Sequence, residues 1–133
     1  MLRYTTQNST SSWGLLILRV LVSIALLTHG YPKLMKLLAG PPYEFADPIG
    51  LGVTFSLILT VFAEFICPLL IILGLWTRWA TLPVIITFLI IILKVHAGEP
   101  FQEVELAFFY LVSYVCLLFT GPGKFSLEGW KYK

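Results

Sequence analysis

Four long apolar segments divide the 133-residue chain, and polar or proline-rich stretches separate them. They run from about residue 13 to 38, 53 to 76, 80 to 95 and 103 to 120. A helix needs about 20 apolar residues to cross the hydrocarbon core of a bilayer, and these runs reach or approach that length. The pattern predicts an all-α integral membrane protein, built as a four-transmembrane-helix bundle.

The segments end at residues that interrupt a helix. The loop 39–52 contains Pro41-Pro42 and Asp47-Pro48, which exclude a continuous helix there. We interpret this loop as a tether, with the alternative that it covers one mouth of the bundle. Pro83 is expected in the first turn of the third segment, where proline is tolerated. Gly121-Pro122-Gly123 should stop the fourth segment.

Composition supports a lipid-facing surface. The chain is 58% hydrophobic and 12% charged, with a mean hydropathy of +0.88, whereas a soluble domain carries about 25% charged residues. The net charge of +2 and the lack of a basic run interleaved with aromatics argue against a nucleic-acid partner. At this length we expect a single domain over residues 1–133. Cys67 and Cys116 lie in apolar runs and do not indicate a disulfide.

One carboxylate, Glu64, stands well inside the apolar run 60–78. An ionised carboxylate in hydrocarbon costs at least roughly 2.5–3.5 kcal/mol, so it is normally paired, protonated or turned to a wet cavity. The first segment carries a polar stripe at helical spacing that should face other helices. Its members are Arg19, Ser23, Leu26, Gly30 and Lys33, with His29 beside them.

These ionisable residues can neutralise one another inside the bundle. We expect Glu64 to pair with Arg19 or with a histidine, and Glu105 to pair with Lys94 or Lys33. One interpretation is that such pairs only fix the register of the helices. The other is a site for a small polar ligand or a quinone. In it, Glu64, His29, His96 and Glu105 handle protons, and Arg19, Lys33 and Lys94 bind the ligand or balance charge.

Metal and haem sites have weaker support. A di-metal four-helix bundle uses Glu-x-x-His pairs, which are missing from this sequence, so no metal site is predicted. The two histidines, one in each of two segments, are a thin basis for haem ligation. Hydrolase and dithiol motifs are also missing. The cofactor therefore stays open, with a quinone as the candidate.

Four spans place both termini on one side of the membrane. Five basic residues belong to that side and three to the other, which favours cytoplasmic termini. The five are Arg3, Arg78, Lys124, Lys131 and Lys133, and the three are Lys33, Lys36 and Lys94. A signal peptide is disfavoured because Arg19 interrupts the first apolar run and no small-residue cleavage site follows.

Several stretches, spread over nearly the whole chain, together resemble the DoxX family of small four-span membrane proteins. They are Leu18-Arg19-Val20, His29-Gly30-Tyr31-Pro32-Lys33, Phe62-Ala63-Glu64-Phe65, Gly74-Leu75-Trp76-Thr77-Arg78, His96 with Glu105, and residues 121–128. Leu127-Glu128 departs mildly from the pattern, because such proteins often show an aspartate there. The resemblance implies a four-helix bundle in a bacterial inner membrane, and a link to quinone and sulfur-compound redox systems.

Three functions remain open at this point. The first is a redox-associated subunit, such as a subunit of an oxidoreductase. It would bind a quinone or a small sulfur compound and work with redox partner proteins. The second is a non-catalytic scaffolding or assembly subunit. The third, weaker because the chain is small and has no inverted repeat and few helix breaks, is a small-solute or proton transporter, an alternative that a homo-oligomer would strengthen.

Overall fold

A computed structural model describes residues 9–131, and within them all regular secondary structure is helical, with no strand. The elements are α1 (Ser9–Leu38), α2 (Val53–Val61), η2 (Phe62–Ile66), α3 (Cys67–Leu73), α4 (Thr77–Ile90), η3 (Ile91–Val95), α5 (Phe101–Thr120) and α6 (Leu127–Lys131). Four stretches of helix are long and apolar enough to cross a membrane: Ser9–Leu38, Val53–Leu73, Thr77–Val95 and Phe101–Thr120. The predicted all-α membrane fold with four spans is confirmed.

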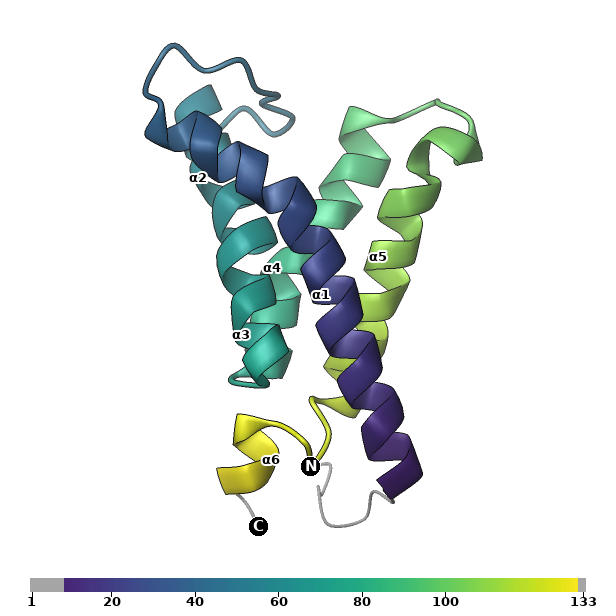
Figure 1. Ribbon diagram of the computed structural model, residues 1–133. Helices are drawn as coiled ribbons and strands as arrows, with labels where there is room; N and C mark the ends of the chain where they lie inside the picture. The colour runs from purple at the N-terminus through teal and green to yellow at the C-terminus, as the bar shows by residue number, and fades with distance from the viewer. Residues whose placement is uncertain (1–8, 132–133) are drawn as a thin grey trace.

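The bundle has two distinct ends (Figure 1). We call the loop end the one that holds the loop 39–52 and the turn between η3 and α5. The terminal end holds the start of α1, the α3–α4 turn and α6. Helix α1 packs on α2, η2, α3 and α5, while α4 packs on α3 and α5. Toward the loop end, α1 and α2 diverge from α4 and α5 (Figure 1).

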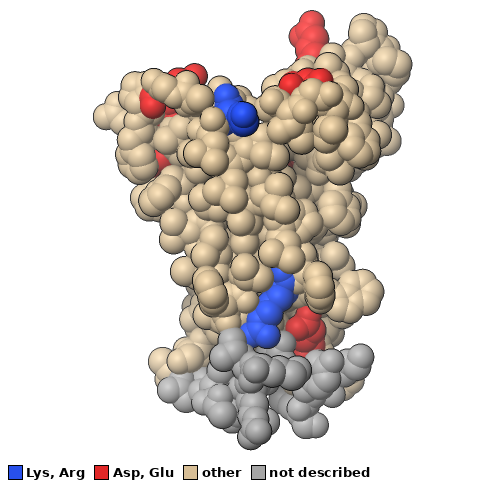
Figure 2. Space-filling view, turned by 180° about the vertical axis from the view of Figure 1, so that it is seen from behind, with Lys and Arg blue, Asp and Glu red and all other residues tan. Residues whose placement is uncertain are grey.

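Charged groups lie at the two ends of the molecule. On the face shown in Figure 2, a wide uncharged belt separates the acidic and basic groups of the loop end from those of the terminal end. This is the distribution that a bilayer requires, because hydrocarbon cannot solvate exposed charges. The buried core draws on all four spans: Leu26, Cys67, Ile71, Ala80, Val84, Phe88, Tyr110, Tyr114 and Leu117.

The second span is not one regular α-helix. Its middle, η2, is a π-helical turn that contains Glu64. Pro68 has no N–H, so in regular α-helix the carbonyl of Glu64 would have no donor four residues on. Wider turns of this kind are inserted where the regular ladder cannot be completed, and they are frequent at functional sites. A second π-turn, η3, ends the third span.

The third span begins earlier than the sequence predicted. Gly74 (φ 71°) and Trp76 (φ 50°) both adopt the left-handed conformation, which turns the chain tightly enough for α4 to start at Thr77. Pro83 therefore lies inside α4 and not in its first turn, so that expectation was wrong. The stop after the fourth span is confirmed, because α5 ends at Thr120 and Gly121 has φ 73°.

Candidate functional site

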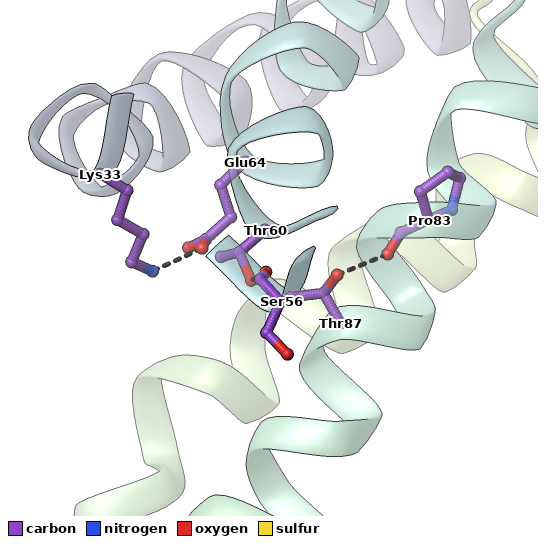
Figure 3. Close-up of polar contacts among 6 residues, drawn as sticks. All are labelled: Lys33, Ser56, Thr60, Glu64, Pro83 and Thr87. Carbon is purple, nitrogen blue, oxygen red and sulfur yellow. Dashed lines mark hydrogen bonds and ion pairs between the residues drawn. The ribbon is translucent and has the colours of Figure 1, made fainter. Parts of the chain in front are cut away.

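Glu64 and Lys33 form a buried ion pair between α1 and η2. Lys33 Nζ donates to Glu64 Oε2 (Figure 3). The Glu64 side chain is 2% exposed and that of Lys33 is 27% exposed. Opposite charges in contact largely offset the cost of removing each from water. The partner of Glu64 is thus Lys33, and the expected pairing with Arg19 or a histidine was wrong.

Gly30 sets the approach of the two elements that carry this pair. A Cβ atom at position 30 would lie 2.1 Å from the backbone oxygen of Glu64, so only glycine fits there. The backbone of η2 therefore rests directly on α1, three residues before Lys33. This contact fixes the depth at which Lys33 meets the carboxylate.

Arg19 has a different role from the one expected. Its side chain is 2% exposed, and it donates hydrogen bonds to the backbone oxygens of Ile71 (3.0 Å), Pro122 (2.9 Å) and Phe125 (2.7 Å), with a longer one to Ile72 (3.4 Å). Ile71 lies seven residues beyond Glu64, about 10 Å along the span toward the terminal end. Arg19 therefore fastens the end of α3 to the segment after α5, and it cannot reach Glu64.

His29 lies on α1 next to α5. Its ring meets Tyr110 edge-on, with centroids 5.9 Å apart, and Tyr110 in turn stacks on Phe88 at 5.1 Å. His29 thus packs against an aromatic pair formed by α4 and α5.

The remaining predicted site residues lie at the loop end. His96 Nδ1 is 2.8 Å from Glu99 Oε2, while Lys94 and Glu105 are exposed. The ion pairs found among residues 9–131 are Lys33–Glu64 and His96–Glu99. The expected pairing of Glu105 with Lys94 or Lys33 was therefore wrong, because Lys33 is engaged by Glu64.

A cavity of about 530 Å³ opens beside the ion pair, between the second and third spans. Lys33 reaches it from α1, and Phe45, Ala46, Pro48 and Ile49 of the loop 39–52 also line it. The loop is thus part of the cavity wall and more than a tether. Its place is fixed by Asp47, whose carboxylate accepts hydrogen bonds from Gly52 N (3.0 Å) and Ser56 Oγ (2.9 Å).

Few polar groups line this cavity, and they come from three spans. Besides Lys33 and His96 they are the hydroxyls of Ser56, Thr60 and Thr87 (Figure 3). Each hydroxyl donates its proton inside the protein, to Asp47, to Ser56 O and to Pro83 O respectively. They therefore offer a ligand lone pairs, whereas Lys33 has further N–H donors beyond the one that Glu64 accepts.

The hydroxyls of Ser56, Thr60 and Thr87 are not among the site residues predicted from the sequence. The spacing of Ser56, Thr60 and Glu64, four residues apart each, was a signal that could have found the first two. Thr87 depends on how α4 sits against α2, which no local pattern encodes. Within the described part of the chain, no group of three or more His, Cys, Asp or Glu side chains is placed to hold a metal. Both cysteines are free thiols, Cys67 buried and Cys116 exposed.

Comparison with known proteins agrees with this architecture. The model of the DoxX family matches residues 14–97, which include Arg19, His29, Lys33, Glu64 and His96 but not Glu105. The uncharacterized membrane protein Rv3486 of Mycobacterium tuberculosis is 30% identical over 130 residues, covering 86% of this chain and 79% of that protein. No solved structure matches the chain. Since the family model covers well over half of its length, the chain belongs to the DoxX family.

Proposed function

We propose that this membrane protein is a redox-associated subunit that binds a quinone in the cavity beside Lys33 and Glu64. One observation carries the proposal: a largely apolar cavity of about 530 Å³ borders a charge-neutral ion pair whose carboxylate is buried. Ligand sites are typically about 300–1,000 Å³ in volume, apolar in most of their lining, and equipped with a few placed polar groups. In this proposal the protein sits in a bacterial inner membrane, with both termini in the cytoplasm.

The charges of the site favour a neutral ligand. Lys33 is neutralised by Glu64, and His96 contacts Glu99, so neither side chain is free to balance a bound anion. A small sulfur oxyanion would have to lose its hydration in an apolar cavity without a counter-charge, which is costly. A quinone carries no charge and presents carbonyl oxygens. These considerations select the quinone over the sulfur compound.

The polar lining of the cavity suits both redox forms of such a ligand. A quinone carbonyl accepts hydrogen bonds, which Lys33 can donate, whereas a quinol hydroxyl donates, and the hydroxyl oxygens of the cavity wall can accept. Interconversion of the two forms moves two electrons together with two protons. In this proposal Glu64, through Lys33, and His96, in the cavity wall, exchange those protons. In this proposal the electrons pass to or from a partner protein.

The test is the affinity of the purified protein for a tail-less benzoquinone, measured for the wild type, Glu64→Gln and Lys33→Met. Loss of a charged hydrogen-bonding partner is worth about 1.5–3 kcal/mol, so Kd should rise about tenfold or more in each variant. The matched control is Lys36→Met, because Lys36 lies one turn further along α1, bonds to Glu44 O and does not line the cavity. Equal binding by all four proteins would refute the proposal.

A second candidate is a non-catalytic scaffolding subunit, in which the ion pair only holds α1 against η2. The close contact of Gly30 with the backbone of Glu64 favours it, because such a contact holds α1 and η2 in a fixed position. Under this alternative, Glu64→Gln lowers the melting temperature in detergent, and the wild type does not bind quinone. Under the first proposal, added quinone raises the melting temperature of the wild type more than that of Glu64→Gln.

A further inference from the structure

A second hollow continues from the cavity along the seam between α3 and α4. Its lining is Phe62, Cys67, Leu70, Trp76, Trp79, Ala80 and Pro83, and its volume is again about 530 Å³. Phe62 and Pro83 also line the cavity beside Lys33, so these two residues border both spaces. We call the second space the seam groove.

The chemistry of the walls changes along this path. The cavity contains Lys33, His96 and three hydroxyl groups, whereas no charged or hydroxyl side chain lines the seam groove. From Phe62 to Leu70 the groove follows the second span for eight residues, about 12 Å at the rise of a helix, and it then reaches the α3–α4 turn. It ends between Trp76 and Trp79, which are 63% and 76% exposed and have the character of interfacial anchors.

Small side chains open the groove. Cys67 and Ala80 are the small residues in its lining, and Pro83 adds only a compact ring. Phe62, which is 45% exposed, stands at the junction with the cavity. A ligand with a polar head and a long apolar chain would match the polar lining of the cavity and the apolar lining of the groove. It would also match the combined length of the two spaces.

We propose that the ligand is a long-chain amphiphile that fills both spaces, with its head beside Lys33 and its hydrocarbon or isoprenoid tail in the seam groove. This inference rests on the proposed function, because the quinone head is what occupies the cavity. A bilayer lipid entering between Trp76 and Trp79 is the competing occupant. It would leave the polar cavity unfilled, whereas a tailed quinone fills the cavity and the groove with one molecule.

The experiment compares two probes that share one head: 2,3-dimethoxy-5-methyl-1,4-benzoquinone and its 6-decyl derivative. Affinities are measured in nanodiscs of fixed lipid composition for the wild type, Leu70→Trp and Leu69→Trp. Leu70 lines the groove, and its neighbour Leu69 is an exposed residue that does not. Leu69→Trp therefore controls for the effect of a new tryptophan and for partition of the decyl chain into the bilayer.

We expect the decyl chain to tighten binding by about tenfold or more in the wild type and in Leu69→Trp, because burying a few methylene groups is worth that much. In Leu70→Trp this gain should fall to about threefold or less, with the tail-less affinity unchanged. If Leu70→Trp does not fold, Trp79→Ala provides a second test, since it shortens the groove at an exposed position and should reduce the gain in the same direction.

Two results would overturn the inference, and they can be told apart. A decyl gain that is the same in Leu70→Trp and Leu69→Trp, with tail-less binding intact, removes the groove as the tail site and leaves the proposed function standing. Failure of the tail-less probe to bind the wild type removes the proposed function, and the inference falls with it. Decyl-dependent binding in that second case would mark the groove as a lipid site.

Discussion

At the scale of single residues, the sequence predicted that Glu64 is buried but not what it contacts. A carboxylate within an apolar run must turn away from lipid, and the pattern of a single helix is enough to predict this. The choice between Arg19 and Lys33 depends on how far α1 is shifted along the second span. That shift is set by the contact of Gly30 with the backbone of Glu64, a fit between two helices that neither segment encodes alone.

Gly30→Ala should therefore destabilise the protein. Its Cβ would meet backbone atoms of Glu64 at 2.1 and 2.6 Å, so one helix must move, at a typical cost of about 1–3 kcal/mol. The same shift should separate Lys33 from Glu64 and weaken quinone binding. Gly14→Ala is the control, because a Cβ at position 14 of the same helix meets nothing within 4 Å. That change should be neutral or stabilising by up to about 1 kcal/mol.

Thermal unfolding in detergent measures both glycine variants, and a quinone titration measures the effect on the site. Equal melting temperatures for Gly30→Ala and Gly14→Ala would show that α1 and η2 are not in the tight contact described above. A stable Gly30→Ala protein with normal binding would remove the geometric basis of the ion pair.

At the scale of elements, apolar runs and Gly or Pro stops predicted all four spans to within a few residues at most ends. The π-turn at Glu64 was not predicted, although Pro68, four residues later, gives it a reason. The early start of α4 was missed because it depends on the left-handed backbone of Trp76. Such a conformation is uncommon for a residue other than glycine and is not visible in a hydrophobic pattern.

Helix α6 was also not predicted from the sequence. It joins the C-terminal segment to the α3–α4 turn. Glu128 Oε1 accepts a hydrogen bond from Thr77 N (2.7 Å) at the start of α4, and Glu128 N donates to Gly74 O (3.1 Å). A side chain that caps the start of a helix in this way is worth about 1 kcal/mol. Short C-terminal sequences of this kind look like polar tails until such partners are known.

Glu128→Ala should lower the free energy of unfolding by about 0.5–2 kcal/mol, because the start of α4 loses its acceptor. Glu128→Gln keeps an oxygen at the same position and should lose clearly less. Both variants should bind a tail-less quinone normally, since α6 lies at the terminal end (Figure 1) and the loop 39–52 that lines the cavity lies at the loop end. Urea or thermal unfolding in detergent measures the stability of both variants. An equal loss of stability in the two would contradict the capping role.

At the scale of the whole molecule, the start of α1 and helix α6 lie at the same end, as four spans require (Figure 1). Lys124 Nζ donates to Ser9 Oγ (3.0 Å) there, and Arg78 binds the backbone oxygens of Leu118 and Phe119. Arg3 and Lys133, which contribute to the predicted orientation, lie outside the described residues, as does the side chain of Lys131. The orientation thus stays a prediction from charge.

The excess of basic residues at the terminal end predicts that this end faces the cytoplasm. Single cysteines test it, in a background with Cys67→Ala and Cys116→Ala. A membrane-impermeant maleimide should label Glu99→Cys, at the loop end, in intact cells. It should label Lys124→Cys only after the cells are made permeable. Labelling in the opposite order would reverse the orientation and place the cavity mouth on the cytoplasmic side.

The central claim is that the cavity beside Lys33 and Glu64 holds a quinone, and photo-crosslinking with an azido-quinone tests it most directly. We expect adducts on two separate stretches, residues 45–63 and 83–96, which line the cavity from opposite sides. Excess decyl-quinone should abolish them, and Glu64→Gln should reduce them. Adducts confined to exposed residues of α5, such as Leu106 and Phe109, and unaffected by the competitor, would contradict the claim.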